Sequence, residues 1–167
     1  MWLCGDLCGF PVMVCVVYLV VANGAHSGNA DIMRYISEDV NRWTGAKEVL
    51  ILGDVNGHIQ SIDGYEDSNG SLLLETAWAL SLEVLNLRPD CEGEFTWCAR
   101  TSRSSIDYAL ASPRLAQHVR HIHIDEEGRF SIGSDHNRIK LTISSSVWRP
   151  NMNERRAPAV RYLPKAA

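Results

Sequence analysis

The chain contains 167 residues, of which 46% are hydrophobic and 22% are charged, and its formal net charge is −4. This composition excludes an intrinsically disordered chain and predicts one globular domain with a sizeable hydrophobic core. No stretch of the sequence reaches the roughly 18 to 20 consecutive apolar residues that a membrane-spanning helix requires. We therefore expect no membrane partner.

The charge is distributed unevenly along the chain. Residues 1–99 contain 14 acidic and 4 basic side chains, whereas residues 100–167 contain 12 basic and 6 acidic ones. The second part is the one expected to face a polyanion. The negative total argues against tight non-specific binding of DNA by this chain alone, although bound divalent cations would offset part of it.

The first predicted element is a buried strand at residues 11–21, a segment rich in β-branched valine. Residues 1–10 are predicted to form an N-terminal extension outside the domain. The apolar run within residues 1–27 can be mistaken for a secretory signal peptide. It lacks a basic start and carries Asp6 where positive charge is expected, so the strand is the preferred interpretation.

A helix and a second strand follow. Asn29 is predicted to cap a helix, because apolar residues recur with helical spacing as far as Trp43. Residues 48–53 predict a buried strand that ends in glycine. Residues 54–70 predict a polar loop with three glycines, and residues 71–85 predict a second helix with one broad apolar face.

Short strands dominate the second half of the chain. They are predicted at residues 95–98, 106–111, 121–125 and 137–144. Ser112 and Pro113 predict the start of a short helix between the second and the third of these strands. This order of strands and helices predicts an α/β fold with a mixed sheet. Residues 11–146 are assigned to that domain, and residues 147–167 to a basic, proline-containing tail.

Polar clusters lie at the ends of three predicted strands. They are Asp54, Asn56 and His58 in GDVNGH, Asp107 in SSIDYAL, and Ser134, Asp135 and His136 in GSDHN. Strand ends that gather on one edge of a sheet are where α/β folds build their sites. We therefore expect these clusters to meet in space.

The residue types in the clusters suit phosphate-ester chemistry with a metal ion. Asp54 and Asp135 supply carboxylates, the ligands that a hard cation such as Mg²⁺ requires. Asn56 follows Asp54 by two residues, so on an extended segment both side chains project from one face, and the amide can bond a phosphate oxygen. Asp107 is the natural partner to fix the tautomer of His136, which can then stabilise charge developing on phosphorus.

Each cluster alone also has a purely structural explanation. Asp-x-Asn before glycine is a common turn, and Ser-Asp-His suits a helix cap or a turn. Chance rarely supplies all three clusters in this order, so their combination favours an active site over three separate turns.

Three longer blocks carry a family resemblance. ILGDVNGHI, TWCARTSRSSIDYALAS and GSDHNRIKLTI are similar to the G-D-F-N-[AG]-H, T-W…S-x-I-D-Y and S-D-H blocks of the endonuclease/exonuclease/phosphatase superfamily. Over residues 12–149 the chain most resembles the apurinic-like endonuclease domains of non-LTR (LINE-type) retrotransposons. The resemblance implies the C-terminal part of a four-layer α/β sandwich with mixed β-sheets, the DNase I-like fold. It also implies Mg²⁺ or Mn²⁺ as cofactor, DNA as substrate, a reverse transcriptase domain in the parent polyprotein as partner, and an intracellular, nuclear location.

The resemblance implies a role for each matching residue. The implied catalytic residues are Asp54, Asn56, Asp107, His136 and Tyr18, the implied metal ligands are Asp135 and Asp54, and the implied substrate-binding residues are Asn56, His58, Ser105 and Ser134. Asp54 would orient or deprotonate the attacking water, and Asn56 would hold the scissile phosphate. Tyr18 is similar to the tyrosine of a Y-x-P-N stretch, although Asn23 lies further along here and the proline is absent.

These observations predict a metal-dependent phosphodiester hydrolase of endonuclease type that nicks DNA for retrotransposition. Family members usually carry a further N-terminal half-sheet with a magnesium-binding glutamate, and neither is found in this sequence. We therefore expect an inactive, truncated copy in which an apolar sheet face lacks its partner.

Two alternatives stand beside this prediction. The first is a non-catalytic retrotransposon remnant or binding domain. The second, less favoured, is a calcineurin-like metallophosphatase, because GDVNGH is similar to the G-D-x-H-G block of those enzymes. Asn56 stands where that block requires histidine, and the later G-N-H-[DE] block is absent.

Overall fold

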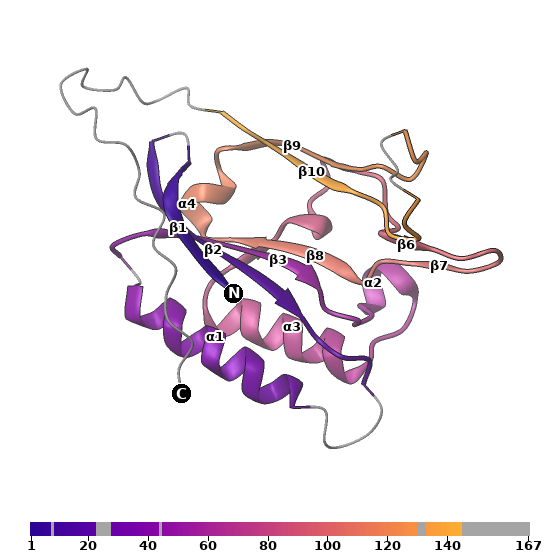
Figure 1. Cartoon of the computed structure of the whole chain (residues 1–167), viewed down its shortest axis with the longest axis horizontal. Coiled ribbons are helices and arrows are strands. Elements are labelled where there is room, and N and C mark those ends of the chain that lie inside the picture. Colours follow the sequence, from indigo (N-terminus) through magenta and orange to yellow (C-terminus); the bar gives the residue numbers. More distant parts are fainter. Residues whose placement is uncertain (8, 23–27, 44, 130–132, 145–167) are drawn as a thin grey trace.

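The computed structural model describes residues 1–7, 9–22, 28–43, 45–129 and 133–144. Figure 1 shows these residues arranged in layers. Helices α1 (Asn29–Trp43) and α3 (Ser68–Ala79) lie along one side of a five-stranded sheet, and strands β9 (Val119–Ile124) and β10 (Ile139–Ile143) lie on the other. The α/β fold with mixed sheets that the sequence predicts is confirmed.

The five-stranded sheet has the order β1-β2-β3-β8-β4. Its strands are β1 (Trp2–Leu7), β2 (Phe10–Tyr18), β3 (Glu48–Asp54), β8 (Asp107–Ala111) and β4 (Glu83–Val84). The neighbours β2 and β3 run parallel, because α1 forms the crossover between them, whereas the other neighbouring pairs are antiparallel. The sheet is therefore mixed, and its central strand β3 separates a parallel from an antiparallel partner.

Both faces of this sheet are covered by apolar side chains. On the helical side the core includes Val17, Met33, Ile51, Leu73 and Leu110. On the opposite side a second core includes Val12, Leu50, Ala109, Leu115 and Ile122. Because a strand that is buried on both faces carries apolar residues continuously, the runs in β2 and β3 were recognisable as buried strands from the sequence.

The first residues of the chain belong to the sheet. Residues 1–10 are predicted from the sequence to be an extension, but β1 pairs with β2 from Trp2 opposite Cys15 to Leu7 opposite Phe10. The Trp2 ring also meets the Trp43 ring edge-on, at a centroid distance of 5.3 Å. Most β1 side chains are exposed, so this edge strand lacks the apolar alternation by which strands are recognised. Strand β2 ends at Tyr18, three residues before the predicted end.

Helix α1 forms as its apolar spacing predicts and buries Met33, Ile36 and Val40. Asn29 does not act as the predicted cap. Its side chain instead accepts a hydrogen bond from Val20 N at 3.2 Å and donates to Val20 O at 2.8 Å. This pair of bonds joins the start of α1 to the chain that leaves β2.

The predicted loop at residues 54–70 contains more structure than expected. It holds the one-turn helix α2 (Gln60–Asp63), and α3 starts at Ser68 rather than at residue 71. The earlier start follows from Asp67, whose side chain caps the helix by accepting from Gly70 N at 2.8 Å. Helix α3 ends at Ala79 rather than residue 85, because β4 and the 3₁₀-helix η1 (Leu85–Leu87) follow.

The second sheet has three strands in the order β10-β9-β5, with β5 at Cys91–Glu92. Together with helix α4 (Pro113–Ala116) it covers the non-helical face of the five-stranded sheet. Its outer face is polar, with His121 and His123 opposite Thr142 and Lys140 in the β9–β10 register. The unpartnered apolar face expected from the sequence is therefore not found on this outer surface within the described residues.

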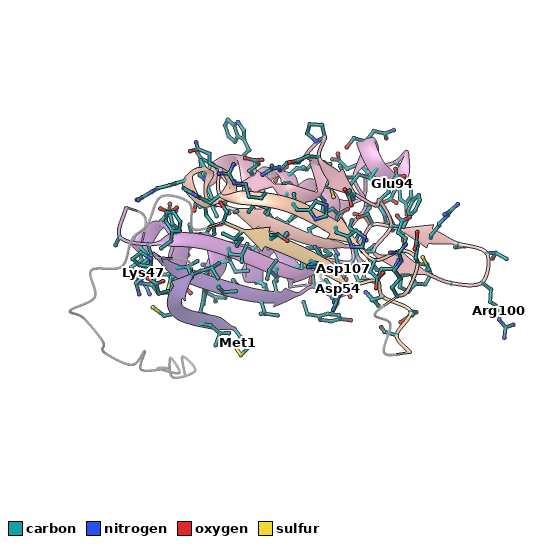
Figure 2. All side chains as sticks on the ribbon, turned by 90° about the horizontal axis from the view of Figure 1, so that it is seen from above. Met1, Lys47, Asp54, Glu94, Arg100 and Asp107 are labelled. Atoms are coloured by element: carbon teal, nitrogen blue, oxygen red, sulfur yellow. The ribbon has the colours of Figure 1, made fainter. Side chains whose placement is uncertain are left out.

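Exposed apolar side chains gather elsewhere, on β1, on β2 and in the residues that follow β2. They are Leu3, Val16, Tyr18, Val20 and Val21, with 36–63% of each residue exposed. The remaining strands, β6 (Trp97–Cys98) and β7 (Arg103–Ser104), form a hairpin that projects beyond the sheets, with Arg100 at its tip (Figure 2). Across the described residues, no helix combines the length and apolarity needed to cross a membrane. The predicted tail at 147–167 lies outside the described residues.

Candidate active site

Three of the predicted catalytic residues form one row across neighbouring strands. Tyr18 is the register partner of Asp54 across β2 and β3, and Asp54 is the register partner of Asp107 across β3 and β8. Register partners project from the same face of a sheet. Gly53 makes the close approach of β2 and β3 possible, because a Cβ atom there would lie 1.9 Å from Val17 O.

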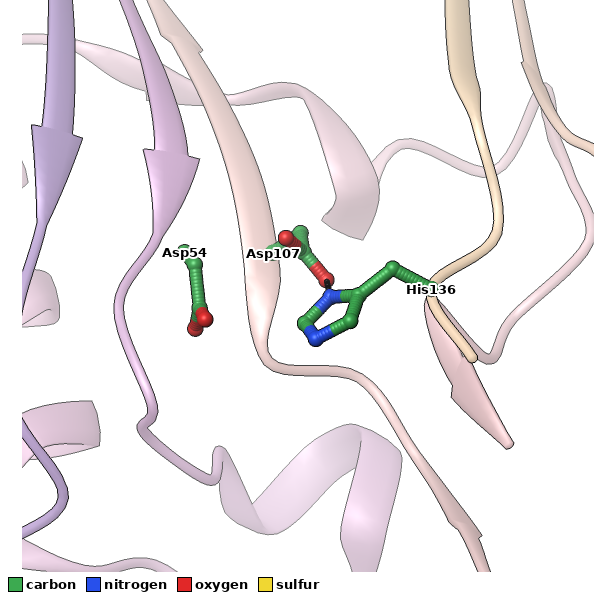
Figure 3. A group of neighbouring side chains, drawn as sticks. All are labelled: Asp54, Asp107 and His136. Carbon is green, nitrogen blue, oxygen red and sulfur yellow. Dashed lines mark hydrogen bonds and ion pairs between the residues drawn. The ribbon is translucent and has the colours of Figure 1, made fainter. Parts of the chain in front are cut away.

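His136 joins this row from the segment that precedes β10 (Figure 3). Its Nδ1 lies 2.8 Å from Asp107 Oδ2, so the contact expected from the sequence is present. Ligand atoms of Asp54, Asp107 and His136 all lie within 4.8 Å of one another. Two strand ends and one loop therefore bring two carboxylates and an imidazole into a single cluster, here called the Asp–Asp–His cluster.

Two polar side chains that sequence reasoning missed fix the position of Asp107. The buried Thr96 Oγ1 accepts hydrogen bonds from the backbone N–H groups of Ile106 and Asp107, each at 2.9 Å. Asn86 Nδ2 donates to Asp107 O at 3.1 Å and its Oδ1 accepts from Ala109 N. Such positioning hydrogen bonds leave no signal in the sequence, because they depend on contacts between distant segments.

Asn56 lies beside the cluster in a turn rather than on an extended strand. The sequence predicts that Asp54 and Asn56 share one face of an extended segment, but β3 ends at Asp54 and Asn56 has a φ angle of 47°. Asparagine tolerates this left-handed conformation better than most residues. Its backbone N–H donates to Asp54 Oδ1 at 2.9 Å, and its Nδ2 donates to Leu19 O at 2.9 Å. One amide hydrogen of Nδ2 is left for another acceptor.

A buried pair of asparagines holds this turn in place by hydrogen bonds. Asn69 Nδ2 lies 2.9 Å from Val55 O and 3.0 Å from Asn56 O, while Asn69 Oδ1 accepts from Asn29 Nδ2 at 2.9 Å. Both asparagines are almost fully buried. The pair, here called the Asn29–Asn69 bridge, ties the turn to the starts of α1 and α3. In the sequence, Asn69 appears only as part of SNG at the start of a helix, a pattern too common to mark it as a residue of the site.

His58 lines a groove next to the Asp–Asp–His cluster. Its Nδ1 lies 3.0 Å from Asp63 Oδ2, and its ring lies over the Tyr65 ring at a centroid distance of 4.5 Å. The groove has a volume of about 570 Å³ and is also lined by Asn56 and His136. The predicted substrate-binding residue His58 is therefore in a position to meet a molecule that contacts His136.

The two serines predicted to bind substrate differ in their placement. Ser105 is fully buried, its Oγ has no hydrogen-bond partner among the described residues, and it does not line the groove, so its predicted substrate-binding role stays a prediction. Its backbone N–H instead supports Asp63 by donating to Oδ1 at 3.2 Å. Ser134 is exposed, and its Oγ accepts from His136 N at 3.0 Å.

Asp135 lies outside the Asp–Asp–His cluster. Its Oδ2 accepts a hydrogen bond from Trp97 Nε1 at 3.0 Å, and this bond is the main reason that the pKa of Asp135 falls below the ordinary value. Its backbone carbonyl accepts from Cys98 N at 2.9 Å. Asp135 thus anchors the β6–β7 hairpin to the loop before β10, and its predicted role as a metal ligand stays a prediction.

Charges within the cluster shift two pKa values upward. Partial burial raises the pKa of Asp54, and the negative charge of Asp107 raises it further, against a lowering by the hydrogen bond from Asn56. Burial alone would lower the pKa of His136, but Asp107, Asp54 and Asp135 together outweigh it and raise the pKa. The two carboxylates therefore favour the protonated form of the imidazole.

The cluster has the chemistry that a divalent cation requires. Carboxylate oxygens are the ligands that Mg²⁺ prefers, and it usually takes only one or two of them together with waters and substrate phosphates. The carboxylate of Asp54 is available as such a ligand, whereas one oxygen of Asp107 already contacts His136 Nδ1. Partial burial is the first cause that raises the pKa of Asp54, and a divalent cation held at this carboxylate would favour its ionised form. The residues present therefore fit the predicted metal ion.

A family model described as endonuclease-reverse transcriptase matches residues 12–140. The chain belongs to the endonuclease-reverse transcriptase family. This match places it in the endonuclease/exonuclease/phosphatase superfamily that the three blocks resemble, and it leaves the calcineurin-like alternative without support. No curated protein matches the chain at a significant level.

Solved structures with the same fold include an endonuclease domain, an exonuclease and a further superfamily protein. The endonuclease domain of TRAS1, a telomere-specific non-LTR retrotransposon, is 20% identical with a TM-score of 0.59, covering 80% of this chain and 55% of that one. The 3′-5′ exonuclease NExo from Neisseria meningitidis is 19% identical with a TM-score of 0.63, covering 79% and 61%. A superfamily protein from Leptotrichia buccalis C-1013-b is 17% identical with a TM-score of 0.58, covering 83% and 51%.

These structures confirm the DNase I-like α/β fold for this member of the endonuclease-reverse transcriptase family. The chain spans between about half and three fifths of the length of each solved structure. At this level of identity the likeness establishes the fold alone.

Proposed function

We propose that this chain is a metal-dependent phosphodiester hydrolase of endonuclease type that nicks DNA. The observation that carries the proposal is the Asp–Asp–His cluster, in which Asp54, Asp107 and His136 come from three distant segments yet lie within 4.8 Å of one another. The family match supports the same chemistry.

Each residue of the site has a task that its surroundings suit. Asp54 orients the attacking water and accepts its proton, and the raised pKa of Asp54 brings its basicity closer to neutral pH. The raised pKa of His136 favours the imidazolium, which donates to a phosphate oxygen and stabilises the negative charge that develops there. Asp107 holds that ring in place through Nδ1.

Two further residues complete the proposed site. Asn56 donates its remaining amide hydrogen to the scissile phosphate, because its other one is bonded to Leu19 O. Tyr18, which is exposed and in register with Asp54, contacts the substrate from the neighbouring strand. A Mg²⁺ or Mn²⁺ ion held by Asp54 would polarise the phosphate and lower the pKa of a bound water.

The biological setting is also part of the proposal. We infer that the nick serves retrotransposition, with a reverse transcriptase domain of the parent polyprotein as partner and the nucleus as location. The description of the matching family, which joins an endonuclease to a reverse transcriptase, supports this setting, and so does the retrotransposon endonuclease domain among the similar structures.

The test is nicking of supercoiled plasmid DNA by the purified chain in the presence of Mg²⁺ or Mn²⁺. We expect nicked circles that disappear with EDTA and with Asp54→Ala, while Asp31→Asn, on the exposed surface of α1, retains activity. A folded chain that binds DNA without nicking it would contradict the proposal. That result would support either the truncated copy without activity or the non-catalytic binding domain, both of which the sequence also predicts.

A further inference from the structure

We propose that His58 binds a second phosphate of the substrate, adjacent to the one that Asn56 and His136 contact. This inference rests on the proposed function and specifies its substrate class. A site that grips two successive phosphates takes a polynucleotide strand in preference to a single phosphate ester. Nothing in the comparisons assigns a role to His58.

The first argument is the similarity of two histidine–aspartate pairs in one groove. His58 Nδ1 lies 3.0 Å from Asp63 Oδ2, and His136 Nδ1 lies 2.8 Å from Asp107 Oδ2. In both pairs the carboxylate occupies Nδ1 and leaves the opposite ring nitrogen, Nε2, without a hydrogen-bond partner among the described residues. Both histidines line the groove of about 570 Å³. Each ring can therefore present Nε2 to a phosphate oxygen in the same groove.

The second argument is that the carboxylates near His58 are already engaged. Asp63 is only 4% exposed, and its two oxygens contact His58 Nδ1 and Ser105 N. Asp67 Oδ1 accepts from His58 N and from Gly70 N, where it caps α3. These contacts spread the negative charge over N–H donors and reduce the repulsion that a phosphate would meet.

The third argument is that His58 is held rigidly but stays accessible. Its ring is fixed between Asp63 and Tyr65, while 21% of its side chain remains exposed. Arg103 also lines the groove, stacks over the Phe95 ring at 4.9 Å and adds a positive charge. A ring that is oriented before the substrate arrives loses little side-chain entropy on binding.

The position of His58 relative to Asn56 sets the expected order of contacts. The two residues are separated only by Gly57, in the turn that directly follows Asp54. Both residues line the same groove, so a strand with one phosphate at Asn56 can place the neighbouring phosphate at His58. Binding of both phosphates fixes the direction of the strand across the Asp–Asp–His cluster.

The test counts phosphate contacts by the salt dependence of binding. Affinity for a short DNA duplex is measured by fluorescence anisotropy over a range of salt concentrations in a mildly acidic buffer. Each phosphate contact contributes about 0.9 to the slope of log K against log salt. We expect His58→Ala to reduce the slope by about one contact and the affinity by about tenfold, and His58→Arg to keep the slope.

The matched control is His121→Ala. His121 also pairs with a carboxylate, since its Nε2 lies 3.0 Å from Glu92 Oε1, but it stands on the outer face of the three-stranded sheet. This variant should retain the slope of the unsubstituted chain. Thermal melting of all three variants shows whether a reduced slope comes from a lost phosphate contact or from a lost fold. If His58→Ala does not fold, the slope measured for His58→Arg tests the inference.

The outcomes separate this inference from the proposed function. An unchanged slope in His58→Ala, with plasmid nicking that still depends on Asp54, overturns the inference and leaves the proposed function. A reduced slope without any nicking supports the phosphate contact and overturns the catalytic proposal. Absence of DNA binding by the folded, unsubstituted chain overturns both.

Discussion

Asp54 and Asp107 face each other as register partners on the neighbouring strands β3 and β8. Two like charges directly opposite one another destabilise a sheet. The negative charge of Asp107 adds to the effect of burial, and both raise the pKa of Asp54. This pairing disfavours the ionised form of Asp54, so it suits a chemical role of the two carboxylates better than a role in stabilising the sheet.

Replacement of Asp54 by asparagine should stabilise the metal-free chain at neutral pH. Because the pKa of Asp54 is raised in the folded state, the folded chain binds this proton more tightly than the unfolded chain, whose ordinary value is 3.8. The associated stability is present below pH 3.8 and is lost as the pH rises through the folded-state pKa. We expect a melting temperature roughly 2 to 5 °C higher for Asp54→Asn at pH 7 in EDTA.

The measurement is thermal unfolding of both proteins at pH 7 and at pH 3. The difference should vanish at pH 3, where the carboxyl group is protonated in both states. Asp31→Asn, on the surface of α1, serves as the control for removal of a negative charge. A lower melting temperature for Asp54→Asn at pH 7 would mean that the ionised carboxylate stabilises the fold.

Loss of the Asp107 carboxylate should alter the pH dependence of activity. His136 keeps its proton to higher pH because Asp107, Asp54 and Asp135 raise its pKa. Activity that requires the imidazolium is therefore retained below this pKa and falls as the pH rises through it. We expect Asp107→Asn to reduce the nicking rate by roughly 10² to 10⁴ and to move the alkaline limb to lower pH.

The pH–rate profile of both enzymes on the same plasmid checks this expectation. An alkaline limb at the same pH in the variant would show that another group controls it. Trp97→Phe provides a comparison, since it removes the hydrogen bond to Asp135 without touching the His136–Asp107 pair.

The Asn29–Asn69 bridge should contribute to stability and to activity. Asn69→Ala leaves the buried carbonyl oxygens of Val55 and Asn56 without this donor. Loss of a partner for buried polar groups costs roughly 1 to 3 kcal/mol. We expect urea unfolding to show a free energy of unfolding that is lower by about 2 kcal/mol. The rate of plasmid nicking should also fall, because Asn56 loses the hydrogen bond from Asn69 to its carbonyl oxygen.

Asn41→Ala is the matched control, because Asn41 is exposed near the end of α1. It should change the free energy of unfolding by less than about 0.5 kcal/mol. Equal stability of Asn69→Ala and Asn41→Ala would contradict the role given to the bridge.

The approach of β2 to β3 at Gly53 should not tolerate a side chain. A Cβ atom there would lie 1.9 Å from Val17 O, and the φ angle of 151° also disfavours other residues. We expect Gly53→Ala to destabilise the chain by at least about 2 kcal/mol. Gly5→Ala, on the edge strand β1, meets nothing within 4 Å and should be close to neutral. Circular dichroism melts of the two variants compare them, and similar losses would rule out this explanation.

Local patterns explain why much of the fold is predictable from the sequence. The apolar runs of β2 and β3 and the helical spacing of α1 all appear as expected, because each is decided by residues close in the chain. The edge strand β1 and the short strands β4 and β5 were missed. Strand β1 pairs with the adjacent β2 but is mostly exposed and lacks apolar alternation, whereas β4 and β5 are two residues long and pair with strands that are distant in sequence.

The candidate site is predictable to a similar degree. The convergence of Asp54, Asp107 and His136 was expected because polar residues at strand ends are exposed and recognisable. Thr96, Asn69 and Asp63 were missed, since each is a common residue whose importance arises from its partners. The full burial of Ser105 was not predicted, because a sequence does not report which side of a short segment becomes buried.

Because Tyr18, Asp54 and Asp107 lie in one row across three strands, their alignment depends on the native register of these strands. A slip of one residue between β3 and either neighbour would turn one side chain of the row toward the helices and its partner toward the groove. A chain with β3 and β8 out of register can still be compact and rich in β-structure, yet it cannot assemble the Asp–Asp–His cluster. Formation of the cluster during refolding would thus mark the moment at which β3 and β8 reach their native alignment.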